Sequence, residues 1–134
     1  MNPEIWGVFH DGSIEAITGS VPGVVELRID IEYLRDMFDG GGTHLRVRLG
    51  GCSRLEYRQY DAQATSDLGV IAFREPEVLS VYRLEPLVLG WREGELERAY
   101  DTMEIFLDTG APLTEEQLRG TCERYWDDWD ARRP

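Results

Sequence analysis

The sequence predicts a mainly β fold of the α+β class, an antiparallel sheet or sandwich with one C-terminal helix packed on it. Apolar and polar residues alternate over residues 25–33 and 43–49, as in strands that bury one face. A capping box precedes an amphipathic stretch near the C-terminus, which predicts a helix over residues 114–132. With 134 residues, of which 42% are hydrophobic, we expect a single β-rich domain over residues 1–134.

Residues 25–33 form the strand around which the sheet is expected to assemble. A register slip of one residue would expose its whole apolar set, so this strand should fix its neighbours. Residues 43–49 alternate in the same way and carry Arg46 and Arg48 on the polar face. If the two strands pair, opposite charges across the pair favour one register. The acidic residues that can meet the two arginines are Glu26, Asp30 and Glu32.

The N-terminal residues predict a β-hairpin. Residues 5–10 and 13–18 flank Asp11-Gly12, a pair that accepts the positive φ angles of a two-residue turn. We interpret residues 33–38 as a short helical turn. The remaining predicted strands cover residues 55–60, 68–73, 78–84 and 95–107, with a turn at Gly50-Gly51. Helical spacing is an alternative for the last of these strands, where no helix cap is found.

The C-terminal helix has a clear start. Thr114 and Gln117 form a capping box, and Leu113 can pack on Leu118 as a hydrophobic staple. Its apolar stripe consists of Leu118, Cys122, Tyr125, Trp126 and Trp129. The stripe is expected to pack on the sheet, so replacing Trp129 with Ala should destabilise the protein strongly.

The charge of the chain restricts its partners. All 14 basic side chains are arginine, 26 side chains are acidic, and the formal net charge is −12. This charge opposes binding to nucleic acid or to an anionic membrane and favours a basic protein partner. Cys52 and Cys122 match no metal or redox spacing, and the sequence shows no signal region or membrane-length apolar run. We therefore expect a cytoplasmic protein with both cysteines reduced.

One segment matches a catalytic signature. Residues 106–111 resemble the retropepsin-like motif, in which an aspartate at the end of a strand activates water across a dimer. That fold needs a further strand after the signature, whereas the residues that follow here are expected to form a helix. We therefore interpret Asp108 as a turn residue that can become Asn without loss of activity. Neither cysteine has a recognisable base nearby, so the protein is not expected to be an enzyme.

Three further groups of residues could bind ions, and each has a simpler interpretation. The glycines at 40–42 precede a strand instead of a helix, so they are expected to form a loop rather than a phosphate cradle. His10, Asp11 and His44 are metal-binding types of residue, but so few histidines favour a structural role. The aspartates of the last helix lack the spacing of a calcium loop. We expect no metal and no cofactor.

A pattern in the first part of the chain is similar to that of a bacterial family. It consists of Trp6-Gly-Val-Phe-His-Asp-Gly-Ser-Ile14, the alternating strand, and Gly51-Cys-Ser-Arg-Leu-Glu-Tyr57. These segments resemble small uncharacterised bacterial proteins that share an F-H-D start, some of which look like immunity proteins of toxin systems. The resemblance implies a β-rich binding protein rather than an enzyme, and it assigns no functional residue.

The leading hypothesis is a non-enzymatic acidic protein-binding domain, such as an immunity protein or inhibitor for a basic partner. The expected binding residues are acidic side chains of the last helix, Glu123, Asp127, Asp128 and Asp130. One alternative is a small-ligand-binding domain with an aromatic-lined cleft. The candidates for that cleft are Trp6, Trp91, Trp126 and Trp129, for which core packing is the favoured interpretation. Another alternative is a homodimeric structural subunit that pairs through an exposed strand edge.

Overall fold

The computed structural model describes residues 3–38, 40, 42–59, 63–76, 80–84, 87–91 and 94–132. Strands dominate and form two antiparallel sheets, and a long helix ends the described chain, which confirms the α+β, mainly β fold class. In chain order the elements are η1 (Pro3–Phe9), β1 (Ser13–Gly19), β2 (Gly23–Asp30), α1 (Glu32–Arg35), β3 (His44–Cys52), β4 (Arg54–Gln59), α2 (Leu68–Arg74), β5 (Ser80–Leu84), β6 (Leu87–Trp91), β7 (Gly94–Ala99), β8 (Thr102–Leu107), β9 (Pro112–Leu113) and α3 (Glu115–Arg132).

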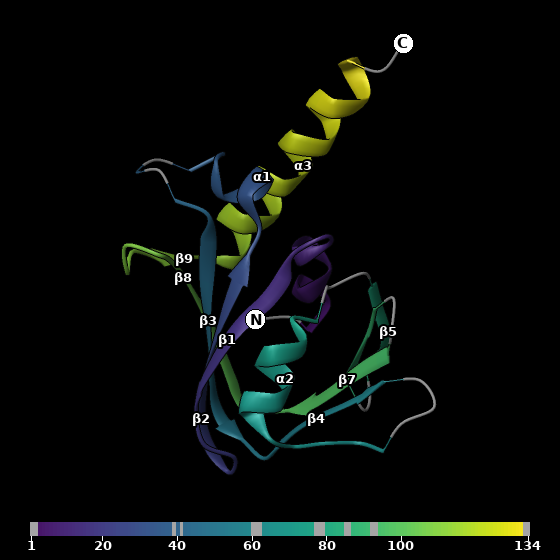
Figure 1. Cartoon of the computed structure of the whole chain (residues 1–134). Coiled ribbons are helices and arrows are strands. Elements are labelled where there is room, and N and C mark those ends of the chain that lie inside the picture. Colours follow the sequence, from purple (N-terminus) through teal and green to yellow (C-terminus); the bar gives the residue numbers. More distant parts are fainter. Residues whose placement is uncertain are drawn as a thin grey trace.

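The sheets are arranged around a shared core (Figure 1). One has five strands in the order β1-β2-β3-β8-β9, and the other has four in the order β4-β7-β6-β5. The helix η1 contacts β5 and α3, whereas α2 packs against β1. Buried apolar residues from both sheets and from η1, α2 and α3 belong to one cluster, so the short helices join the sheets into one packed core.

One bent two-stranded ribbon connects the sheets. β3 continues into β4 and β7 into β8, so the pair β3–β8 lies in one sheet and the pair β4–β7 in the other. Two backbone hydrogen bonds of 2.9 Å hold the bend, from Ser53 N to Ala99 O and from Asp101 N to Gly50 O. Gly51 has a φ of 59°, a left-handed conformation that favours glycine. The turn predicted at these glycines is therefore the corner at which the ribbon changes sheets.

The alternation predicted for residues 25–33 and 43–49 is confirmed over β2 and β3, but β2 ends at Asp30, so the strand predicted to continue to Tyr33 is wrong there, where α1 begins at Glu32. The inward residues of the two strands are all fully buried: Val25, Leu27, Ile29, Leu45, Val47 and Leu49. On the outer face, Arg46 Nε donates to Glu26 Oε1 at 2.7 Å, and Arg48 Nη2 lies 3.5 Å from Glu26 Oε2. Glu26 therefore meets both arginines across the strand pair, as the charge pattern predicted.

The hairpin predicted at the N-terminus is wrong in its first half, which forms the 3₁₀ helix η1. Ile5, Trp6 and Phe9 are all fully buried, so side chains on more than one side of this segment enter the core. A strand would point Ile5 and Trp6 to opposite faces, whereas a short helix between the sheets can bury both. Asp11 has the positive φ expected of a turn residue, 68°, but its turn connects η1 to β1.

The strand predicted over residues 68–73 is also wrong, because this segment forms α2. Asp67 is the N-cap, and its side chain accepts a hydrogen bond of 3.1 Å from Val70 N. Ile71 is fully buried, while Phe73 is 85% exposed, so the apolar run contacts the core along one side only. The cap residue at position 67 was the local signal for this helix.

Other predicted elements agree with the structure where it describes them. The helical turn expected at residues 33–38 corresponds to α1, and the strand expected at residues 55–60 corresponds to β4. Residues 95–107 form β7 and β8, so the strand interpretation is confirmed over the helical one. β5 covers the later part of the strand predicted at 78–84, and positions 60, 78 and 79 lie outside the described residues.

The helix α3 begins as the capping box predicted. Gln117 N donates to Thr114 Oγ1 at 3.1 Å, and Gln117 Oε1 accepts from Thr114 N at 2.8 Å. Its first turns place Leu118 in the core, and later turns pack on η1 and α1. In Figure 1 the C-terminal half of α3 extends beyond both sheets. The expectation that Trp129 is a core residue is wrong, since its exposed fraction is 41%.

Two tryptophans should therefore respond differently to truncation. Trp6 is fully buried and its indole N–H donates to Tyr100 Oη at 2.9 Å, so Trp6→Ala should lower the free energy of unfolding by about 3–5 kcal/mol. Trp129→Ala removes a partly exposed side chain and should cost less, about 1–2 kcal/mol. Chemical denaturation of both variants measures the difference. Equal losses would contradict the burial assigned to these residues.

Candidate functional site

An aromatic cluster joins α3 to the rest of the molecule. We use this name for His10, Tyr33, Tyr125, Trp126 and Trp129. The ring centroids of Tyr33 and Tyr125 are 4.6 Å apart, and those of Tyr33 and Trp126 are 5.7 Å apart. Tyr33 Oη also donates to His10 O at 2.7 Å, and burial raises the pKa of the Tyr33 hydroxyl. The cluster anchors the middle of α3 through contacts between aromatic rings.

A groove runs beside the cluster, between η1 and α3. Its volume is about 310 Å³, at the lower end of the range for small-molecule sites. We call it the η1–α3 groove. It is lined by Glu4, Gly7, Val8, Arg119, Cys122, Glu123 and Trp126. The groove therefore combines one indole and two carboxylates with a single arginine, which is a cation-favouring composition.

The predicted binding residues lie on the exposed part of α3. Glu123, Asp127, Asp128 and Asp130 are all exposed, and Glu123 also lines the groove. Within the described part of the chain, no ion pair involves the carboxylates of Glu123, Asp127 or Asp128. The structure thus places the four residues on one projecting element, beside the partly exposed Trp129.

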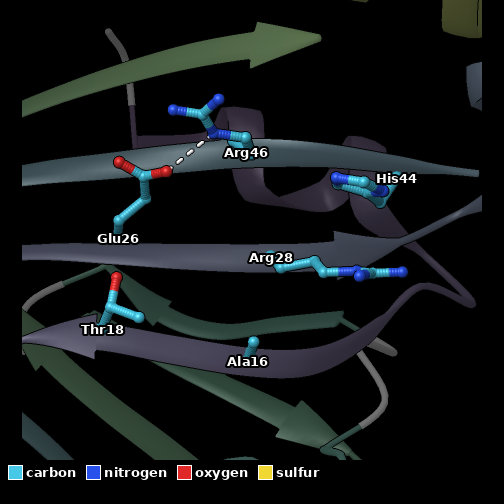
Figure 2. A pocket seen from close by; sticks show the side chains of 6 residues that line it. All are labelled: Ala16, Thr18, Glu26, Arg28, His44 and Arg46. Atoms are coloured by element: carbon cyan, nitrogen blue, oxygen red, sulfur yellow. Dashed lines mark hydrogen bonds and ion pairs between the residues drawn. The ribbon is translucent and has the colours of Figure 1, made fainter. Parts of the chain in front are cut away.

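A second hollow lies on the outer face of the five-stranded sheet (Figure 2). It measures about 140 Å³, and the small side chains Ala16 and Thr18 of β1 form one side of it. The longer side chains come from β2 and β3: Glu26, Arg28, His44 and Arg46. This volume is below the range of about 300–1,000 Å³ that is usual for small-molecule pockets.

The charges around this second hollow are largely neutralised within the sheet. Arg46 donates to Glu26, and this hydrogen bond lowers the pKa of the Glu26 carboxyl despite opposition from burial. Arg28 Nε donates to Asp30 Oδ1 at 2.9 Å. Surface pairs of this kind contribute roughly 0–1 kcal/mol each, so they support strand register more than they create a binding field. We assign no ligand to this face.

Asp108, the aspartate of the protease-like signature, has a structural partner. Arg35 is fully buried, and its Nη2 and Nε lie 2.9 and 3.0 Å from Asp108 Oδ1. Burial opposes ionisation of this carboxyl, but the hydrogen bond and charge of Arg35 hold the pKa of Asp108 below its usual value. A Cβ at Gly42 would overlap the Asp108 carboxylate, so glycine permits the close approach. Asp108 lies in the turn after β8, as predicted, and ties that turn to α1.

The residues considered for ion binding are separated. His10 pairs with Asp11 at 3.5 Å, whereas His44 Nδ1 lies 3.9 Å from Asp108 Oδ2. No group of three or more His, Cys, Asp or Glu residues among those described could hold a metal ion. Gly42 faces a carboxylate, which would repel phosphate, and position 41 lies outside the described residues.

The cysteines and tryptophans occupy different environments. Cys52 is fully buried, Cys122 is partly exposed in the groove, and neither forms a disulfide. Burial raises the pKa of the Cys122 thiol, and a hydrogen bond from Trp126 offsets this rise only in part. Trp6 is a core residue and so does not line a cleft, whereas the side chain of Trp91 lies outside the described part.

Sequence reasoning predicted that acidic residues of the last helix form a binding surface, but it did not predict the groove. The groove needs η1 to be a helix beside α3, and the N-terminal residues were expected to be a strand. No local pattern indicates that Glu4 and Trp126, from opposite ends of the chain, share one surface.

Comparisons of the chain with protein-family models, curated proteins and solved structures return no significant match. Among the described residues, no helix has both the length and the apolar character needed to span a membrane. Function is therefore argued from the geometry of this chain.

The Arg35–Asp108 pair predicts a pH-dependent stability difference. Asp108→Asn removes the carboxylate that pairs with the fully buried Arg35 and should cost about 2–4 kcal/mol at neutral pH. Because the folded pKa of Asp108 is depressed, its contribution is present above the ordinary pKa of 3.8 and is lost as pH falls through the lower folded value.

Urea denaturation at several pH values tests this prediction, with the exposed Glu104→Gln as a matched neutralisation. The gap between wild type and Asp108→Asn should be widest near neutral pH and should shrink in acid. A gap that stays constant down to pH values below 3.8 would contradict the ion-pair explanation.

Proposed function

We propose that this chain is a non-enzymatic, acidic protein-binding domain that captures a basic protein through the exposed half of α3. The observation that carries the proposal is the position of Asp127, Asp128 and Asp130 in the last turns of that helix. The C-terminal end of a helix carries partial negative charge, so aspartates there are electrostatically unfavourable. Aspartate is also a poor helix former. Helix propensity and the helix dipole therefore give no reason for Asp127 and Asp128, whereas recognition of a cation does.

The surroundings of the aspartates support the same proposal. Trp129 is 41% exposed beside them, and partly exposed aromatic side chains are common anchors in protein interfaces. The formal net charge of −12 extends the field of this surface and would speed encounter with a basic partner. Salt should weaken this attraction, because the Debye length falls to about 10 Å at 0.1 M ionic strength.

The resemblance of the N-terminal segments to immunity-like bacterial proteins suggests a more specific form of the proposal. In that form the chain is a cytoplasmic inhibitor in a bacterium, and the basic partner is a toxin or enzyme whose surface it blocks. An inhibitor of this kind needs tight binding and no catalytic group, which fits a surface built from carboxylates and aromatic rings.

Neutralising the three aspartates should separate binding from stability. The triple variant Asp127→Asn, Asp128→Asn and Asp130→Asn should keep or slightly raise the melting temperature, because the helix terminus loses unfavourable charge. Its association rate with a fluorescent nine-residue arginine peptide should fall by about threefold to tenfold at low salt. Stopped-flow mixing at low and high salt measures the rate.

A second variant with the same change in net charge serves as the control. Glu95→Gln, Glu97→Gln and Glu104→Gln remove three carboxylates from strands of the two sheets, away from α3. This variant should associate nearly as fast as wild type. If both triple variants slow association equally, attraction depends on net charge alone and α3 is not the binding element.

A further inference from the structure

The η1–α3 groove has the chemistry of a pocket for one cationic side chain. Trp126 contacts the four other rings of the aromatic cluster, with Tyr125 at 5.1 Å and Trp129 at 5.8 Å between ring centroids. It also lines the groove, so an indole edge or face is available at a fixed position. A rigid indole is the best aromatic partner for a guanidinium or ammonium group.

The charged residues of the groove favour the same kind of ligand. Glu4 and Glu123 contribute carboxylates from opposite walls, η1 and α3. Arg119 is the opposing charge, and its Nη2 lies 3.7 Å from Glu115 Oε1, one turn earlier on the helix. Glu123 forms no ion pair within the described residues, so its carboxylate can pair with a cation of a ligand.

We propose that the η1–α3 groove binds an arginine side chain of the basic partner, with the guanidinium stacked on Trp126 and paired with Glu123. This inference rests on the proposed function and names the contact that would give it specificity. Arginine fits better than lysine, because a planar guanidinium can stack on an indole while it donates to a carboxylate. The exposed aspartates of α3 then attract the partner, and the groove holds it.

Gly7 allows the groove to be filled without disturbing the fold. It is an exposed residue of the groove wall, and a Cβ added there would meet no heavy atom within 4 Å. Gly7→Leu therefore places a side chain into the groove. Gly120→Leu is a matched control, because this glycine lies on α3 outside the groove lining and its Cβ would meet only Arg124 Nη1, at 3.8 Å.

Cys122 provides a direct readout of groove occupancy. Cys122 lines the groove and is partly exposed. Cys52, the other cysteine of the chain, is fully buried and should not react with a thiol reagent in the folded protein. A bound side chain should shield Cys122 from a thiol reagent such as dithionitrobenzoate. The nine-residue arginine peptide and a nine-residue lysine peptide are the two probes.

The inference predicts that the arginine peptide slows the reaction of Cys122 and binds more tightly than the lysine peptide. Gly7→Leu should weaken binding of the arginine peptide by about fivefold and abolish its protection of the thiol, while Gly120→Leu changes neither. The triple aspartate variant should still show protection at saturating peptide, because its groove is intact. If Gly7→Leu unfolds, Glu123→Gln replaces it and should weaken the arginine peptide more than the lysine peptide.

Two failures have different meanings. If Gly7→Leu binds the arginine peptide as wild type does and Cys122 reacts at an unchanged rate, the groove is not the site, although attraction by the aspartates can still hold. If the peptide protects Cys122 but the triple aspartate variant associates as fast as wild type, the groove contact holds and the aspartates are not the attracting surface.

Discussion

The bent ribbon of β3–β4 and β7–β8 is the constraint on which the rest of the structure depends. Its corner at Gly50 and Gly51 lets the same two chain segments pair in both sheets, so the sheets cannot separate without breaking the ribbon. The space enclosed by the two sheets is filled by η1, whose residue Trp6 is fully buried. Because η1 is fixed there, it also forms the surface on which α3 packs.

The packing of α3 explains how one helix can serve both stability and the proposed recognition. Its first turns contribute Leu118 to the core and begin with a well-formed capping box. The aromatic cluster then fixes the middle of the helix. The last turns lie beyond the sheets, where aspartates weaken the helix slightly and create a strong local field. Stability and charge are thus divided along the length of the helix.

The part of the fold that sequence reasoning predicted depends on local or short-period signals. The alternation of β2 and β3, the charge match at Glu26 and the capping box at Thr114 can all be read from neighbouring positions. The features that sequence reasoning did not predict depend on contacts between residues far apart in the sequence. The Arg35–Asp108 pair joins residues 73 positions apart, and η1 becomes a helix because two sheets bury several of its sides.

The burial of Arg98 is a further feature that no local sequence pattern predicts. It is 1% exposed, and its guanidinium carbon lies 4.0 Å from the centre of the Trp6 ring. Burial lowers its pKa to about 9, and Nη1 donates to Leu96 O at 3.2 Å. An alternating strand pattern places residue 98 inward but does not explain an arginine there. The stacking on Trp6 accounts for it in part, through a cation–π contact in a desolvated site.

The most direct test of the account follows the tryptophan indole N–H signals by nuclear magnetic resonance during titration with the nine-residue arginine peptide. The signals of Trp126 and Trp129 should shift progressively, because these residues line or flank the proposed binding surface. The signal of Trp6 should stay in place, since its indole is buried and bonded to Tyr100. Uniform small shifts, or no shift at Trp126, would contradict the claim that α3 and its groove recognise a basic partner.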